Sequence, residues 1–296
     1  MDQAAALRKL RDNSPIKSSQ NRAKKRSAKI FAISSGKGGV GKSTITVNLG
    51  LSLTLEGKKV LIMDGDLGLA NINVIMGIIP KHTLYHVIRG QKTLKEIILQ
   101  TPEGLNIIPG ASGYTQLADL DSNARENLMK SFSEIDDFDY ILIDTGAGIN
   151  SVVINLIMAA DEVIIVTTPE PTSITDSYGL IKSIINRNKN FKLSVIINKA
   201  KDEIEGRKVL KRVVDICSKF LSVVPKEIGV VYKDEEVERS IYVQKPFIIN
   251  SPKSKAADCI FRLCKAIIEE SSGQSEDEKR LSGYLKKFFA NNDKER

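Results

Sequence analysis

Eight consecutive residues decide the fold of this 296-residue chain: Gly36-Lys37-Gly38-Gly39-Val40-Gly41-Lys42-Ser43. They match the pattern G-x-x-x-x-G-K-[ST] of a phosphate loop, in which glycines let backbone N–H groups converge on phosphate oxygens. An apolar run over 29–35 precedes the loop, and a stretch with helical spacing over 44–56 follows it. The helix N-terminus adds the positive end of its dipole. We therefore expect Lys42 to reach the β- and γ-phosphates of a nucleotide and Ser43 to offer its hydroxyl to Mg²⁺.

The rest of the chain continues this alternation of strand and helix. Apolar runs rich in Val and Ile span 29–35, 58–64, 105–109, 140–144, 162–168, 193–198 and 228–232. Stretches with helical spacing lie between several of them, at 44–56, 122–135, 174–187 and 205–221. Continuous apolar runs are typical of strands buried on both faces. The pattern predicts an α/β chain, a three-layer P-loop fold with a mainly parallel sheet covered by helices on both faces.

Three aspartates stand where predicted strands end. Asp64 and Asp66 follow one apolar run in the sequence D-G-D, and Asp144 closes another. Ligands of open α/β sheets bind beyond the carboxyl ends of the strands. Carboxylates at that edge can orient a water molecule and organise a metal shell, and Asp144 fits the Walker B position near Mg²⁺.

A second lysine makes the loop more specific. With Lys37 the motif reads K-G-G-x-G-K-[ST], which resembles the deviant phosphate loop of the MinD/ParA/nitrogenase-iron-protein class, and the likeness covers about residues 30–270. The resemblance implies an ATPase that uses ATP and Mg²⁺ and dimerises when ATP is bound. In such a dimer Lys37 is implied to reach the partner's nucleotide and to stabilise charge in the transition state.

The resemblance also assigns roles to single residues. Asp66 is implied to position the attacking water, while Asp64 and Asp144 join Ser43 in the Mg²⁺ network. Thr44 continues the nucleotide-binding loop, and Asn198, at the end of a predicted strand, is implied to bind adenine.

Two short motifs narrow the resemblance further. The sequence D-T-G-A-G over 144–148 resembles switch II, but MinD more often has Pro where Gly146 stands. Residues 169–172 read P-E-P-T, a stretch seen in FlhG-type members, to which we assign no chemical role. No other catalytic constellation is present: His82 and His86 lack the Glu of H-E-x-x-H, and three cysteines are too few for a disulfide framework.

The net charge of +8 is concentrated at one end. Residues 1–29 hold nine basic and two acidic residues, whereas residues 30–270 hold 29 of each. A domain that wraps nucleic acid is usually basic itself, so we expect no direct nucleic-acid binding. No secretory signal and no apolar run of about 20 residues is present, which predicts a cytoplasmic protein.

Residues 1–29 are predicted to be a partner-binding peptide followed by a basic linker. The peptide Asp2-Gln3-Ala4-Ala5-Ala6-Leu7-Arg8 matches D-Q-A-x-x-L-R, with which FlhG-type proteins stimulate the signal-recognition-type GTPase FlhF. The resemblance implies contacts through Asp2, Gln3, Ala4, Leu7 and Arg8.

Residues 271–296 are predicted to carry an amphipathic helix at 276–290. Its apolar stripe and basic flank are typical of a helix in an anionic membrane interface, and the segment resembles the membrane-targeting helix of MinD and FlhG. The stripe consists of Leu281, Tyr284, Leu285, Phe288 and Phe289. The alternative is a helix docked on its own domain, and the two states could alternate with ATP. The preceding core helix is predicted over 252–270, with Ser251 as its N-cap.

Taken together, the resemblance is to FlhG/FleN-type members of the MinD/ParA family. It implies an ATPase that sets flagellar number or placement from the inner face of the membrane, with flagellar switch proteins or a transcription regulator as further partners. The alternatives are a MinD-type septum-site regulator, a ParA-like DNA-partitioning ATPase that uses its basic arm on phosphates, and a nucleotide-gated scaffold with negligible turnover.

Overall fold

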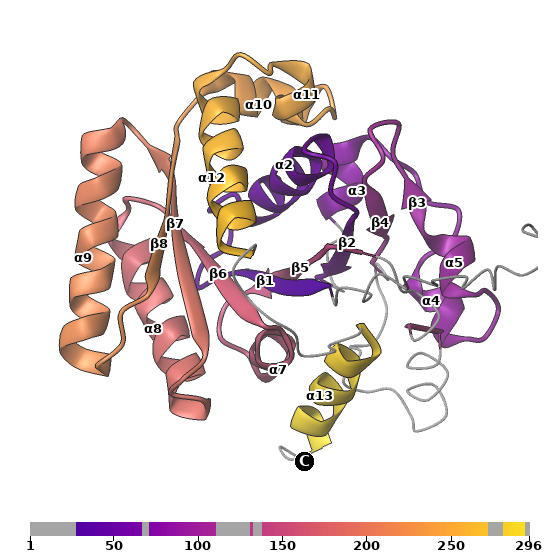
Figure 1. Cartoon of the computed structure of the whole chain (residues 1–296), viewed down its shortest axis with the longest axis horizontal. Helices are drawn as coiled ribbons and strands as arrows, with labels where there is room; N and C mark the ends of the chain where they lie inside the picture. Colours follow the sequence, from indigo (N-terminus) through magenta and orange to yellow (C-terminus); the bar gives the residue numbers. More distant parts are fainter. Residues whose placement is uncertain (1–27, 67–70, 111–130, 133–137, 272–280, 294–296) are drawn as a thin grey trace, which may run out of the picture.

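The computed structural model describes residues 28–66, 71–110, 131–132, 138–271 and 281–293 (Figure 1). At its centre lies an eight-stranded sheet in the order β3-β4-β2-β5-β1-β6-β7-β8. All pairs of neighbouring strands in it are parallel except β3 and β4, at one edge. The strands are β1 (Lys29–Ser35), β2 (Val60–Gly65), β3 (Leu99–Gln100), β4 (Asn106–Ile108), β5 (Tyr140–Ala147), β6 (Glu162–Thr167), β7 (Lys192–Ala200) and β8 (Lys226–Tyr232). The predicted α/β fold with a mainly parallel sheet is therefore confirmed.

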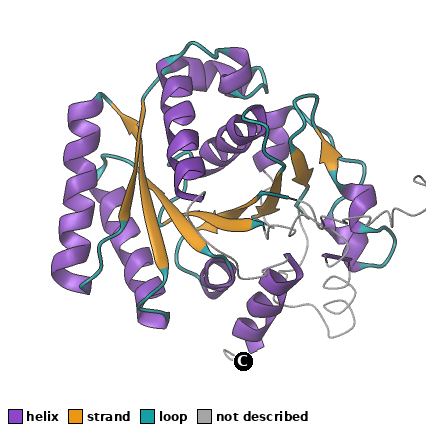
Figure 2. Cartoon of the chain, in the orientation of Figure 1, coloured by secondary structure: helices purple, strands orange, loops and turns teal. Residues whose placement is uncertain are grey.

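Helices cover both faces of this sheet, which makes three layers (Figures 1 and 2). One buried apolar cluster joins the sheet to α4 (Leu84–Ile88), α5 (Leu94–Ile97), α7 (Ser151–Ala159), α8 (Pro171–Arg187), α9 (Glu203–Leu221) and α13 (Leu281–Asp293). The other joins it to α2 (Lys42–Leu55), α3 (Asn71–Met76), α10 (Glu235–Tyr242), α11 (Phe247–Asn250) and α12 (Lys255–Ser271). Every residue of β2 and β6 is buried, as expected for strands covered on both sides.

Some predicted boundaries are wrong. The helix predicted over 252–270 begins at Lys255, and the hydroxyl of Ser254 accepts the backbone N–H of Ala257. Ser251 is therefore not its N-cap; its hydroxyl donates to Glu236. Strand β5 runs past Asp144 to Ala147, and most of the helix predicted over 122–135 lies outside the described residues.

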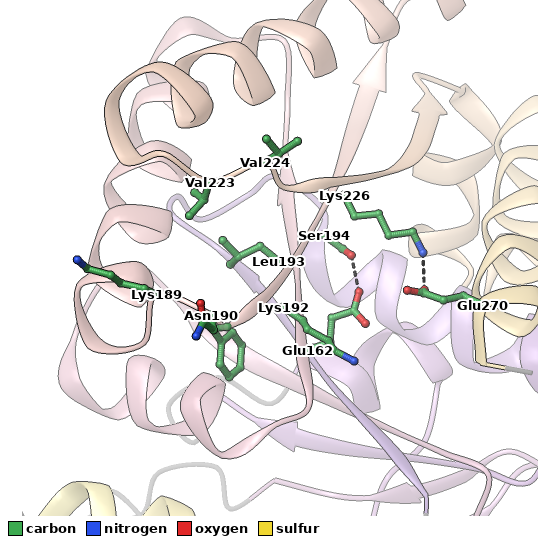
Figure 3. A pocket seen from close by; sticks show the side chains of 11 residues that line it. Glu162, Lys189, Asn190, Lys192, Leu193, Ser194, Val223, Val224, Lys226 and Glu270 are labelled. Carbon is green, nitrogen blue, oxygen red and sulfur yellow. Dashed lines mark hydrogen bonds and ion pairs between the residues drawn. The ribbon is translucent and has the colours of Figure 1, made fainter. Parts of the chain in front are cut away.

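The strand ends opposite the phosphate loop carry an ion cluster (Figure 3). The carboxylate of Glu162, at the start of β6, accepts from the Ser194 hydroxyl and lies 3.1 Å from the Lys29 ammonium. Glu270, near the end of α12, pairs with Lys226 at the start of β8. The cluster thus ties the first residue of β1 and the last turn of α12 to the same pole of the molecule.

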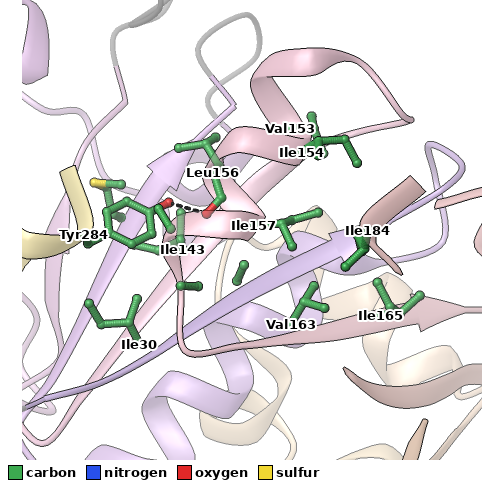
Figure 4. Packing of buried hydrophobic residues seen from close by; sticks show 14 of the residues in the cluster. Ile30, Ile143, Val153, Ile154, Leu156, Ile157, Val163, Ile165, Ile184 and Tyr284 are labelled. Carbon is green, nitrogen blue, oxygen red and sulfur yellow. Dashed lines mark hydrogen bonds between the residues drawn. The ribbon is translucent and has the colours of Figure 1, made fainter. Parts of the chain in front are cut away.

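The C-terminal helix α13 packs against α7 (Figure 4). Tyr284, Phe288 and Phe289 are buried in the same cluster as α7, and the Tyr284 hydroxyl donates to the carbonyl of Leu156 at 3.0 Å. Leu156 lies in the last turn of α7, where carbonyls lack a partner four residues on. The structure therefore shows the docked alternative for this helix, with Lys286 and Lys287 exposed.

Candidate functional site

The phosphate loop joins β1 to α2 where the parallel strands end. Gly39 and Gly41 adopt positive φ angles of 78° and 91°, a conformation that costs glycine little. Gly36 approaches α8 so closely that a Cβ there would lie 2.3 Å from the backbone carbon and oxygen of Asp176. Glycine is thus required both for the turn and for the close packing of loop against helix.

Lys42 is the first residue of α2 and is buried. Its ammonium donates to Asp144 Oδ1 at 2.7 Å, and the Thr46 hydroxyl donates to the same oxygen at 3.1 Å. The structure therefore brings the predicted phosphate-binding lysine and the predicted Walker B carboxylate into direct contact. Thr46 was missed because a threonine inside a helix carries no sequence signal of its own.

Asp64 and Asp144 are direct neighbours on β2 and β5. Burial and the Asp144 charge raise the pKa of the Asp64 carboxyl to about 8, although the backbone N–H of Asp66 donates to its Oδ1 at 3.0 Å. Oδ2 of each carboxylate is buried without a hydrogen-bond partner in the described part of the chain. Buried carboxylate oxygens with nothing to bind, beside the hydroxyl-bearing loop, fit a site for a hard cation such as Mg²⁺.

Asn198 and Lys199 lie at an irregularity of β7, where its pairing with β8 shifts register before Ala200. Lys199 has a φ of 58°, and its ammonium donates to the carbonyl of Gly39 at 2.8 Å. The Asn198 side chain donates to the carbonyl of Val40 at 2.8 Å. A bulge re-aims side chains, and here it turns both onto the phosphate loop. Asn198 thus braces the loop in this structure, and adenine binding by it stays a prediction.

Lys37 extends from the loop to the start of α8. Its ammonium contacts Glu170 Oε2 at 2.9 Å and the Thr172 hydroxyl at 3.1 Å, and this contact lowers the pKa of Glu170. The P-E-P-T stretch, for which no role was predicted, therefore holds the second lysine of the loop. Lys37 is 39% exposed in its side chain, so it remains open to the surroundings of the loop.

Several predicted residues lie outside the described parts. These are the peptide residues Asp2, Gln3, Ala4, Leu7 and Arg8, together with the side chains of Leu281 and Leu285. Other predicted residues are described and lie where they were expected. Gly38 lies on the loop, Ser43 and Thr44 lie in the first turn of α2, and Asp66 directly follows β2. His82 and His86 pack against each other, with the His86 ring capping α4, and the described residues form no metal cluster with them.

Comparison with known proteins agrees with this geometry. Residues 28–197 match the AAA domain family model. The chain is 39% identical over 230 residues to the antiactivator FleN of Pseudomonas aeruginosa, covering 77% of this chain and 82% of that one. The chain belongs to the MinD/ParA family. It is also 40% identical to the flagellum site-determining protein YlxH of Helicobacter pylori, over 65% of each chain.

Solved MinD structures support the same assignment. MinD of Pyrococcus horikoshii in complex with Mg-ADP superposes with a TM-score of 0.68 at 28% identity, over 83% of this chain and 98% of that one. The Aquifex aeolicus MinC:MinD complex gives a TM-score of 0.68 at 28% identity, over 86% of this chain and 99% of that one. As a member of this family the chain is a P-loop ATPase that uses ATP and Mg²⁺.

Proposed function

We propose that this MinD/ParA-family ATPase controls flagellar number or placement by cycling between a cytoplasmic monomer and an ATP-bound dimer on the inner face of the membrane. One observation carries the proposal: β5 bears Asp144, the predicted Mg²⁺ ligand, and leads through Gly148 directly into α7, and α7 holds the docked helix α13. Helix α7 therefore connects the nucleotide site with the docked helix α13, so a change at one can reach the other. The relative YlxH, a flagellum site-determining protein, supports the flagellar role.

Hydrolysis is proposed to rest on the side chains around the loop. Lys42 leaves Asp144 to hold the γ-phosphate, while Ser43, Asp64 and Asp144 hold Mg²⁺, which neutralises charge that develops on the phosphate oxygens. Asp66 orients the attacking water in line. Among the described residues, the Lys42 ammonium donates to Asp144 at 2.7 Å. In the ATP-bound state the γ-phosphate takes the place of Asp144 as its partner.

The second lysine is proposed to act between subunits. Lys37 exchanges its contact with Glu170 and Thr172 for the nucleotide of the partner, where its charge stabilises the transition state. The pair is exposed, with Glu170 65% accessible in its side chain, and exposed pairs are worth at most about 1 kcal/mol. Nucleotide phosphates can therefore displace Glu170 easily.

The membrane switch is proposed to work by competition for the apolar face of α13. Docked on α7, the helix buries Tyr284, Phe288 and Phe289 within the protein. A γ-phosphate sensed near Gly146 shifts the start of α7, weakens this contact and frees the helix, which then lies in an anionic membrane interface with Leu281 and Leu285 completing its stripe. No helix among the described residues is long and apolar enough to cross a membrane.

The N-terminal segment is proposed to stimulate the GTPase FlhF through its D-Q-A-x-x-L-R sequence, with Gln3 at the partner's site and the basic linker as a tether. Mixing a peptide of residues 1–29 with the GTPase tests this directly. Stimulated GTP turnover that is lost with Gln3→Ala supports the assignment. Unchanged turnover would return the chain to the wider MinD class.

The central test measures ATPase activity and liposome binding together. Asp66→Ala is expected to abolish hydrolysis while ATP binding persists, and to trap the chain as a dimer on liposomes rich in phosphatidylglycerol. Deletion of residues 272–296 should remove liposome binding and leave ATP binding intact. Equal liposome binding with and without ATP, or undiminished hydrolysis by the Asp66 variant, would refute this cycle.

A further inference from the structure

The last turn of α9 and the loop that leads from it to β8 present apolar side chains to solvent. Residues 219–226 read K-F-L-S-V-V-P-K, with a lysine at each end. Phe220 is 62% exposed and Val224 is 72% exposed, although both belong to residue types that are usually buried. We call residues 219–226 the apolar tip.

A second basic turn borders the apolar tip. Lys189 and Lys192, at the turn from α8 into β7, line a hollow of about 380 Å³ together with Val223, Val224 and Lys226 (Figure 3). The acidic side chains in this hollow already have cationic partners, since Glu162 lies beside Lys29 and Glu270 pairs with Lys226. Apolar groups flanked by lysines are the composition that partitions into an anionic membrane interface.

Both chain termini leave the core beside this surface. Lys226, the last residue of the apolar tip, is ion-paired with Glu270, one residue before the end of α12 and the start of the segment that leads to α13. Lys29, 3.9 Å from Glu270, is where the arm of net charge +7 enters β1. The segment that leads to the C-terminal helix therefore starts beside the apolar tip.

We propose that the apolar tip is a second membrane contact, in which Phe220 and Val224 enter the interface of an anionic bilayer while the exposed Lys189 and Lys219 meet its headgroups. The contact lies at the strand ends opposite the phosphate loop, which leaves the two phosphate loops of the ATP-bound dimer free to face each other. This inference rests on the proposed membrane association and adds to it a second contact surface. A single amphipathic helix binds weakly and reversibly, so a second contact strengthens attachment without new helices.

The absence of tryptophan from the chain permits a direct test. Phe220→Trp gives one fluorophore in the apolar tip of the full-length protein. Ile204→Trp is the matched control, because Ile204 is 81% exposed on the same helix but sixteen residues away, roughly 24 Å at 1.5 Å per residue. With ATP and phosphatidylglycerol vesicles, we expect a blue shift and quenching by brominated lipid at position 220 and neither effect at position 204.

A second pair of variants measures the contribution to binding. Phe220→Ser with Val224→Ser is expected to weaken vesicle binding about fivefold or more with unchanged ATPase activity, whereas Ile204→Ser leaves both unchanged.

The outcomes separate this inference from the membrane cycle on which it rests. Deletion of residues 272–296 could abolish vesicle binding while the double variant binds vesicles like wild type and the emission of the Phe220→Trp variant stays unshifted. In that case the apolar tip is not a lipid contact, and the membrane cycle still stands. If the wild-type chain binds no vesicles with ATP, both proposals fail. Loss of a protein partner from the double variant, with lipid binding intact, would likewise overturn the lipid assignment.

Discussion

Replacing Tyr284 by Phe tests whether docking of α13 controls membrane binding. The substitution removes the hydroxyl that donates to the Leu156 carbonyl and keeps the aromatic ring, which is 1% exposed. Burial raises the pKa of this hydroxyl, so it stays protonated and remains a donor at every physiological pH. Phe is at least as apolar as Tyr, so the free helix keeps its affinity for lipid while its docked state is weakened.

The magnitude follows from a single neutral hydrogen bond. Such a bond contributes about 0.5–1.5 kcal/mol, and the Leu156 carbonyl in the last turn of α7 has no helical partner to replace it. The docking equilibrium should therefore shift by about two- to tenfold toward the free helix.

Two measurements read out this shift without nucleotide. Amide hydrogen exchange over 281–293 should accelerate by that factor, and sedimentation with phosphatidylglycerol vesicles in the absence of ATP should increase. Tyr242→Phe is the matched control, because Tyr242 is 88% exposed and lies far along the chain on α10. Unchanged exchange and unchanged ATP-free binding for Tyr284→Phe would refute the idea that docking withholds the helix from the membrane.

Three further predictions concern the core. Gly36→Ala should lower the thermal midpoint of the nucleotide-free protein, because the added Cβ would lie 2.3 Å from the backbone of Asp176. Gly38→Ala is the control and should leave the midpoint unchanged, because the space around its added Cβ is open. Equal midpoints for the two variants would contradict the packing argument. Glu162→Gln should lower the free energy of unfolding in denaturant by up to about 3–5 kcal/mol, because Lys29 loses its buried partner and keeps Glu270 at 3.9 Å. Glu203→Gln, in an exposed pair with Arg207, should lower it by less than about 1 kcal/mol. Burial raises the pKa of the Cys217 thiol to about 11, so the thiol stays neutral below that pH. All three buried thiols should therefore react with Ellman's reagent at pH 8 only after the protein unfolds. Rapid reaction of the folded protein would show that the core opens.

Local sequence was sufficient for the parts of the site that lie close together along the chain. The phosphate loop needs glycines at fixed spacing and a lysine at a helix start, and such requirements are written in eight residues. Asp64 and Asp144 were predictable for a related reason, since parallel strands bring their carboxyl ends to one edge. Helix starts were less predictable, because both Ser251 and Ser254 are residues that can cap a helix. In the folded chain the Ser251 hydroxyl donates to Glu236, and Ser254 caps α12 instead.

The sequence by itself predicted the α/β fold, the phosphate loop and the placement of Asp64 and Asp144 at the strand ends. Each of these depends on a local pattern or on the geometry common to parallel sheets. Which distant groups meet was settled only by folding. The folded chain places Glu170 on Lys37, turns Lys199 onto Gly39 through a bulge, and packs Tyr284 against Leu156. These contacts join residues more than a hundred positions apart, and their energies depend on shape and burial that no local pattern encodes.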